Sequence, residues 1–157
     1  MLPRLPVALT LMALCVAIHA AGVSWALQQL RRRSRKALRF WASTRLFVHV
    51  AIWIVLLHLG EISLWAAFYL WRHAMPDLPS AMYFSAVTYT TTGYGDLVLA
   101  EGWRLLGAVE ALTGILMCGW STGIFFAIVN RVYEVVPDAL SHDPPKSRRD
   151  AAPSRAL

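Results

Sequence analysis

The sequence predicts an all-α membrane protein with three transmembrane helices and one shorter segment that enters the membrane without crossing it. Two observations on composition support this fold class: of the 157 residues, 57% are hydrophobic and only 15% are charged. Soluble domains are about 45–50% apolar and about 25% charged. A third observation is that the apolar residues gather in three long runs. A globule of this size could not remove so much apolar surface from water, so the composition argues against an ordinary soluble enzyme.

The three apolar runs predict helices within residues 1–30, at residues 46–70 and at residues 103–130. Each run exceeds about 18 residues and contains few charges, so each can cross roughly 30 Å of hydrocarbon. The first run also admits a cleaved signal peptide, for which Arg4 is weak support. Its length, against the usual apolar core of about 7–15 residues, and its poor cleavage pattern favour a transmembrane helix.

A different kind of segment separates the second and third runs. It contains two prolines, then a short apolar stretch, then Gly93 and Gly95. The segment is too short and too interrupted to span, so we expect a re-entrant element with a helix at residues 80–91 and Ser80 as its N-cap. The C-terminal end of such a helix carries partial negative charge and would favour a cation near the bilayer centre.

Lysine and arginine are distributed unevenly over the connections, and this distribution predicts the orientation. The loop at residues 31–45 has seven basic residues and no acid, whereas residues 72–101 have one basic residue and three acids. The tail at residues 133–157 contains four Lys and Arg residues and is rich in Pro, Arg, Ser and Asp, which predicts disorder. We expect a multi-pass protein of the plasma (cell inner) membrane, with the N-terminus outside and the C-terminus cytoplasmic. The protein has a net charge of +6, and we expect its basic residues to contact membrane lipids. We therefore expect no nucleic-acid partner.

The re-entrant segment ends in a distinctive motif, because residues 91–96 read Thr-Thr-Gly-Tyr-Gly-Asp. Glycines allow successive carbonyl groups to point the same way, and a ring of such carbonyls can replace the water shell of a potassium ion. The motif closely resembles the signature of tetrameric potassium channels, whose usual core is Thr-Val-Gly-Tyr-Gly. Thr92 stands where valine is usual. The alternative is a glycine-rich extracellular turn, which the position between two spans disfavours.

The resemblance covers about residues 46–132 and implies a role for each part of this pore domain. It implies an outer helix at 46–70, a pore helix at 80–91, a selectivity filter at 91–96 and an inner helix at 103–130. The residues whose carbonyls would coordinate potassium are Thr91, Thr92, Gly93 and Tyr94. Gly95 would shape the outer mouth, and Asp96 would accept a hydrogen bond from Tyr83 on the pore helix.

The third span contains two kinds of candidate residue. By resemblance, Gly114 is the best match to a gating hinge and Gly119 to a second small position. Close helix packing explains such glycines equally well. Helical spacing also places four residues on one face, and these are the candidates for the lining of the pore: Ile115, Cys118, Thr122 and Phe126. The last of these could form a hydrophobic constriction.

Two carboxylates lie within the spans, where an ionisable side chain is costly and usually functional. Glu61 and Glu110 lie at similar depth if each is counted from the outer end of its helix, and His58 is one turn from Glu61. We expect these three residues to form a buried polar clamp between the outer and inner helices. The alternative is a regulatory protonation site coupled to the filter.

One chain carries one filter motif and no internal repeat of it, whereas a central pore needs four. The resemblance therefore implies a homotetramer that conducts potassium passively and selectively, with K+ as the permeant ligand and no cofactor. Two alternatives remain: a non-conducting silent subunit or scaffold, and the pore subunit of a potassium-uptake system. An enzyme is disfavoured because the sequence has no Ser/His/Asp set, metal-ligand spacing or phosphate-binding loop.

Overall fold

The computed structural model describes residues 4–32 and 40–140, and the described chain is helical with connecting loops. The elements are α1 (Leu5–Arg32), α2 (Phe40–Trp71), α3 (Leu78–Tyr89), the short 3-10 helix η2 (Glu101–Trp103) and α4 (Arg104–Leu140). Three helices are long and apolar enough to cross a membrane. The expected all-α, multi-pass membrane fold is therefore confirmed at this level. Parts of the predicted basic loop, 33–39, and of the predicted tail, 141–157, lie outside the described residues.

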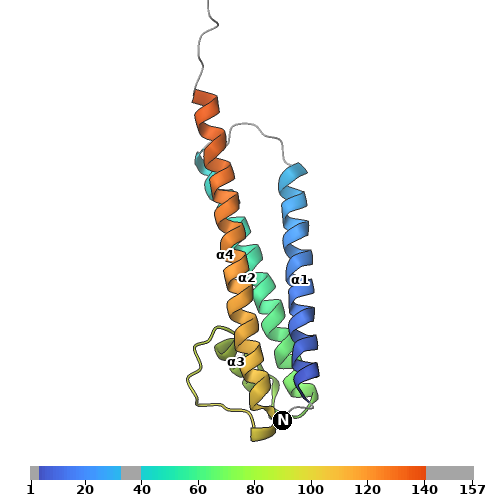
Figure 1. Ribbon diagram of the computed structural model, residues 1–157. Helices are drawn as coiled ribbons and strands as arrows, with labels where there is room; N and C mark the ends of the chain where they lie inside the picture. Colours follow the sequence, from blue (N-terminus) through green and yellow to red (C-terminus); the bar gives the residue numbers. More distant parts are fainter. Residues whose placement is uncertain (1–3, 33–39, 141–157) are drawn as a thin grey trace, which may run out of the picture.

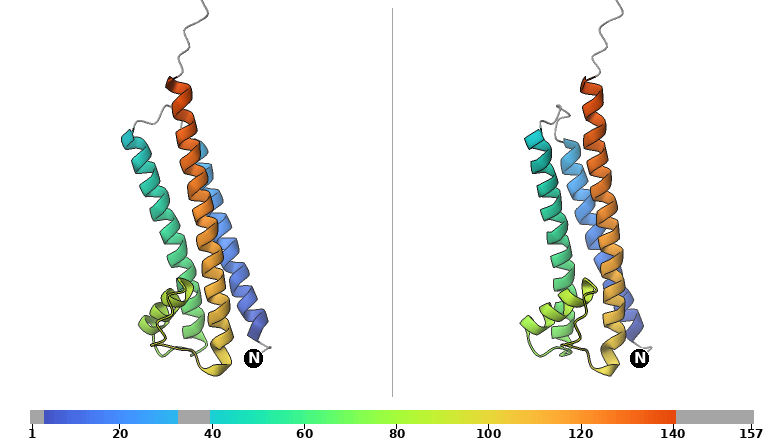
Figure 2. Two further views of the ribbon diagram at one scale, coloured as in Figure 1. Left: turned by 60° about the vertical axis from the view of Figure 1, so that its left-hand side comes forward. Right: turned by 90° about the vertical axis from the view of Figure 1, so that its left-hand side faces the viewer.

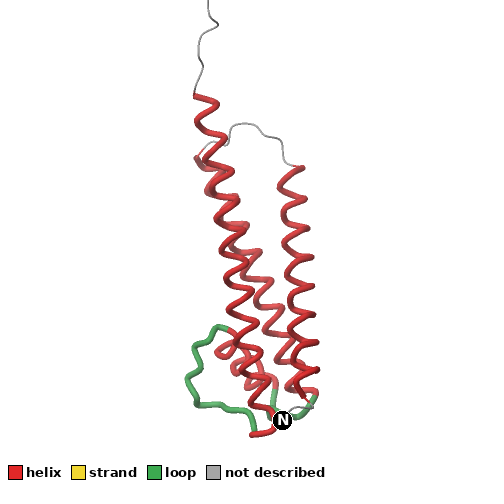
Figure 3. The backbone as a smooth tube through the Cα atoms, in the orientation of Figure 1, coloured by secondary structure: helices red, strands yellow, loops and turns green. Residues whose placement is uncertain are grey.

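The three long helices lie side by side, and the short helix packs at one end of them (Figure 1). α3 and the loop that follows it lie beside the end of α2 and the beginning of α4, and the N-terminus of the chain is at this same end (Figures 1 and 2). The end of α1, the beginning of α2 and the end of α4 lie at the opposite end (Figure 3). The long loop is therefore separated along the bundle from the end of α1 and the beginning of α2.

The long helices extend beyond the predicted spans. α2 begins at Phe40, six residues before the predicted start, and α4 continues to Leu140. Residues 133–140, predicted to be disordered, are therefore helical, which corrects the predicted tail. Hydropathy marks only the part of a helix that suits hydrocarbon. A helix that has formed gains one hydrogen bond for each further residue, so it can continue beyond that part.

The short helix α3 begins earlier than predicted because its N-cap is Asp77 rather than Ser80. The Asp77 carboxylate accepts a hydrogen bond from the Ser80 backbone N–H at 2.8 Å, and Pro79 lies in the first helical turn. Aspartate is a strong N-cap and proline suits the first turn, so the two residues together fix the start of the helix. The bond to Ser80 lowers the pKa of Asp77. The helix ends at Tyr89, two residues before the predicted end.

The buried core joins α3 to the two helices beside it. Tyr69 of α2 meets Phe84 of α3 edge-on, with ring centroids 5.4 Å apart. α4 approaches most closely at Gly114, where an added Cβ would lie 1.8 Å from the carbonyl oxygen of Tyr89. A side chain at residue 114 is therefore incompatible with this packing. Close packing accounts for Gly114, and its hinge role stays a prediction.

Candidate functional site

The loop after α3 has a backbone conformation that depends on glycine. Gly93 and Gly95 have φ angles of +50° and +79°, which residues with a Cβ rarely adopt. A Cβ added at either position would meet no atom within 4 Å, so conformation rather than space requires these glycines. Thr91 also has a positive φ, +60°, and its N–H donates to the Thr88 carbonyl at 2.9 Å. The loop therefore begins as a tight turn on the end of α3.

The loop residues are exposed in the single chain. All six residues at 91–96 are exposed, and Tyr94 retains 73% of its accessible surface. In the part of the chain that the structure describes, the carbonyl groups of residues 91–94 accept no hydrogen bond. The chain thus presents a row of free oxygen ligands that its own atoms leave uncovered.

Two side-chain contacts fix the loop, one to α3 and one between two residues that follow α3. The Tyr83 hydroxyl donates to the Asp96 carboxylate at 2.7 Å, which is the contact expected from the sequence. This hydrogen bond lowers the pKa of Asp96 and raises the pKa of Tyr83. The Thr92 hydroxyl lies 3.0 Å from that of Thr90, so the residue that replaces the usual valine has a local partner. Sequence reasoning did not identify Thr90 as that partner.

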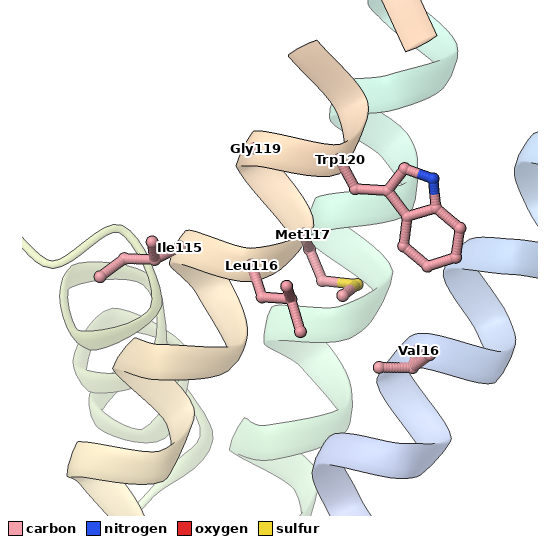
Figure 4. Close-up of a pocket in the computed structure, with 6 residues that line it drawn as sticks. All are labelled: Val16, Ile115, Leu116, Met117, Gly119 and Trp120. Atoms are coloured by element: carbon pink, nitrogen blue, oxygen red, sulfur yellow. The ribbon is translucent and has the colours of Figure 1, made fainter. Parts of the chain in front are cut away.

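One face of α4 is also uncovered in the single chain. The four predicted pore-lining residues are all exposed: Ile115, Cys118, Thr122 and Phe126. Gly119 is exposed too, and a Cβ there would meet nothing within 4 Å. Ile115 lies at the edge of an open apolar cavity of about 460 Å³ and points away from Trp120, which faces α1 (Figure 4). That the four predicted residues line a pore remains a prediction.

A buried polar cluster joins all four helices around Glu61. The Glu61 carboxylate lies 2.8 Å from His19 Nδ1 of α1 and accepts a hydrogen bond from the Tyr89 hydroxyl of α3. His58 Nδ1 lies 3.1 Å from the Tyr89 oxygen. Ser121 of α4 bridges the two imidazoles, with its Oγ 3.0 Å from His19 Nε2 and 3.2 Å from His58 Nε2. Sequence reasoning missed His19, although a polar residue in the middle of an apolar run is the signal that identified Glu61.

Glu110 belongs to a second cluster, which corrects the predicted clamp of His58, Glu61 and Glu110. Its carboxyl group accepts from the Tyr69 hydroxyl at 2.7 Å and is hydrogen-bonded to Ser85. Glu61 lies ten residues before the end of α2 and Glu110 six residues after the start of α4. At about 1.5 Å per residue their depths differ by about one turn. The Glu110 carboxylate meets the Tyr69 hydroxyl instead of Glu61. Each acid still ties helices together, but through separate partners.

The cluster around Glu61 is also the one group of possible metal ligands among the described residues. One ligand atom each from His19, His58 and Glu61 lie within 4.8 Å of one another. Two imidazoles and a carboxylate suit zinc and similar divalent metals. Each of these three side chains already has a hydrogen-bond partner in the cluster.

The fold and the loop together define a multi-pass membrane protein with a row of free carbonyl groups beside a short helix. The ion-channel family model matches residues 46–131, more than half of the 157-residue chain. The chain therefore belongs to the ion channel family, and its function is that of an ion channel. No curated protein and no solved structure matches the chain. The family match covers most of α2, all of α3, the loop and most of α4, and it leaves α1 outside.

Proposed function

We propose that this protein is a potassium-selective channel that conducts K+ passively. The observation that carries the proposal is the loop at residues 91–96, in which two glycines with positive φ angles adjoin four free carbonyl groups. Carbonyl oxygens in a ring can replace the hydration shell of potassium. α3 is then the re-entrant pore helix, and its C-terminal end, with partial negative charge, adjoins this row of oxygens.

Four chains form the pore in this proposal. Each chain supplies one loop, and exposed irregular backbone survives at membrane depth only where it is buried in protein or lines a water-filled cavity. The exposure of residues 91–96 and of the Cys118 face of α4 supports the assembly, since both surfaces would face the shared axis. α4 is the inner helix and α2 the outer helix of each subunit.

The orientation follows from charge. The seven basic residues at 31–45 support a cytoplasmic position for the end of α1 and the beginning of α2, and the end of α4 lies at the same end of the bundle (Figure 1). The loop and the N-terminus lie at the opposite end of the bundle, which then faces the outside (Figure 1). The membrane in this proposal is the plasma (cell inner) membrane.

Ion flux from liposomes that contain the purified protein tests the proposal. We expect K+-loaded liposomes to release K+ and Na+-loaded liposomes to release little Na+, with valinomycin setting the full K+ signal. Gly93→Ala should lose the selectivity because alanine resists the φ angle of +50°. Equal K+ and Na+ release by the wild-type protein would contradict potassium selectivity. A tetramer without flux would instead favour a non-conducting subunit.

A further inference from the structure

The cluster around Glu61 is a closed ring of five hydrogen-bonded side chains. In order around the ring the members are Glu61, His19, Ser121, His58 and Tyr89, and the last returns to the first. Each of the four α-helices, α1 to α4, contributes at least one member of the ring. The side chains of Glu61 and His19 are fully buried, and that of His58 is 16% exposed. Water therefore cannot readily replace a missing link.

The number of protons decides whether this ring is complete. Five links need five protons, one between each pair of neighbouring polar atoms. With Glu61 ionised and both imidazoles neutral, the ring holds only four: one on each histidine, one on Ser121 and one on Tyr89. One link then brings two acceptors together. A fifth proton, on Glu61 or on one imidazole, completes all five links and makes the ring neutral as a whole.

We propose that this ring is a positioning unit for the selectivity filter and that it is complete only when it holds its fifth proton. The proposal rests on the proposed function, because it takes the loop at residues 91–96 to be the filter. The members of the ring act on the filter through Tyr89, so they are positioning residues. It also gives α1 a role in conduction through His19, although α1 lies outside the family match.

Tyr89 connects the ring to the filter. It is the last residue of α3, and the chain turns from it directly into Thr90 and Thr91. Its hydroxyl belongs to the ring, while its carbonyl oxygen packs against α4 at Gly114. The end of the pore helix is therefore held from both sides. A broken link at the hydroxyl removes one of these two constraints beside the first filter residue.

Raising the pH should therefore disturb the filter, because it removes the fifth proton and leaves two acceptors in contact. Two further titratable groups lie near enough to interact electrostatically with Glu61: Cys15 of α1 and Cys118 of α4. Trp120 of α4 stacks near His19 at 5.5 Å and brings no charge. The ring variants are therefore made in a Cys15→Ala/Cys118→Ala background, so that neither thiol contributes to the pH dependence.

A glutamine at residue 61 separates this proposal from a simple charge pair. The Glu61→Gln amide supplies the fifth proton as a permanent N–H, so five links are complete with both imidazoles neutral. Ser121→Ala breaks two links at every pH. Ser63→Ala is the matched control, since Ser63 is exposed on the same helix as Glu61 and its hydroxyl bonds only within α2.

The experiment measures the K+/Na+ flux ratio and the melting temperature of the protein between about pH 5 and pH 8. In the wild type and in Ser63→Ala, both should fall with rising pH. The folding equilibrium constant that the melting reports should fall by about tenfold, the factor that one unsatisfied buried group commonly costs. In Glu61→Gln both should stay high throughout. In Ser121→Ala both should be low throughout.

Three results would overturn the proposal. The first is a Glu61→Gln variant that is weaker than the wild type at low pH, which a charge pair predicts. The second is a Ser121→Ala variant that matches the control. The third is one divalent metal per purified chain, with a melting temperature that chelation lowers, because a metal would then occupy the place of the fifth proton. Melting follows the ring even if the wild type conducts no K+, so failure of the proposed function is distinguishable.

Discussion

At the scale of single residues, the Tyr83–Asp96 hydrogen bond has a definite dependence on pH. The bond lowers the pKa of Asp96. A carboxyl group with a lowered pKa stabilises the folded state above its ordinary pKa, and this contribution is lost as the pH falls through the lowered value. We expect Tyr83→Phe to raise the pKa of Asp96 towards its ordinary value of 3.8. The variant should then be less stable than the wild type at neutral pH, and this difference should shrink as the pH falls through the lowered pKa of the wild type.

A carboxyl-selective NMR titration measures this change. Asp77 is the internal control, because the Ser80 backbone lowers its pKa and Tyr83→Phe should leave that value unchanged. An Asp96 titration that is identical in the wild type and the variant would contradict the hydrogen bond.

Glu110 gives a second prediction at this scale. The Ser85 hydroxyl lies 2.9 Å from the Ile62 carbonyl and also contacts Glu110, but it has one proton for two acceptors. Both contacts are complete when Glu110 is protonated. Glu110→Gln should therefore melt close to the wild type, since its amide can donate to Ser85 and accept from Tyr69. Glu110→Ala should lose about 1–3 kcal/mol because Tyr69 keeps a buried, unsatisfied hydroxyl.

Thermal melting in detergent compares these two variants with Glu101→Ala, which removes an exposed acid at the start of η2. Equal melting of all three variants would remove the structural role of Glu110.

Side-chain contacts between residues that are close in sequence could be predicted. Contacts between helices could not, because they depend on how each helix is rotated about its own axis. The Tyr83–Asp96 contact follows from a motif of fixed spacing. The separate partners of Glu61 and Glu110 could not be predicted from the sequence, because the depth of a residue along a helix does not determine which neighbouring helix its side chain faces. His19 was missed for the same reason: no local pattern connects it to Glu61, 42 residues later.

At the scale of elements, the contact between α3 and α4 depends on a single glycine. A Cβ at residue 114 would lie 1.8 Å from the backbone oxygen of Tyr89, an atom that cannot move without shifting the end of α3. We expect Gly114→Ala to destabilise the protein by about 1–3 kcal/mol, the usual cost of overpacking, or by more.

Gly119→Ala on the same helix is the control for this prediction. A Cβ there meets nothing within 4 Å in the single chain, so the variant should be neutral or gain about 0.5–1 kcal/mol from its lower backbone entropy. Melting that falls equally in both variants would show that the loss does not come from the Tyr89 contact.

Three apolar helices and a shorter helix between the second and third were predicted and are observed, whereas η2 and the ends of the helices were not predicted. Hydropathy located the three spans because burial in hydrocarbon requires apolar residues along their whole length. It could not locate the start of α2 at Phe40 or the end of α4 at Leu140, where the helix continues without that requirement. The start of α3 depended on choosing between two possible caps, and the stronger cap, Asp77, lies three residues earlier than Ser80.

At the scale of the whole molecule, the proposed pore predicts that partner chains cover the exposed loop and the exposed face of α4. We expect four chains in mild detergent, detected by native mass and by chemical crosslinking that proceeds to the tetramer. A Tyr94→Cys variant in a background without Cys15 and Cys118 should crosslink between chains, because residue 94 would face the shared axis. Crosslinking that stops at the dimer while K+ flux is intact would contradict one filter segment per chain.

The His19–Glu61 pair has a further consequence for how the chain is made. Synthesis begins at the N-terminus, so α1 and α2 are complete before α3 and α4 exist. An acidic residue at the centre of a lone span costs about 2.5–3.5 kcal/mol on insertion into the bilayer. His19, 2.8 Å from the Glu61 carboxylate in the finished protein, is the first partner from another helix that this acid can meet. We therefore expect the first helix to act as an insertion partner for the second, so that the Glu61 carboxyl group enters the bilayer with a hydrogen-bond partner.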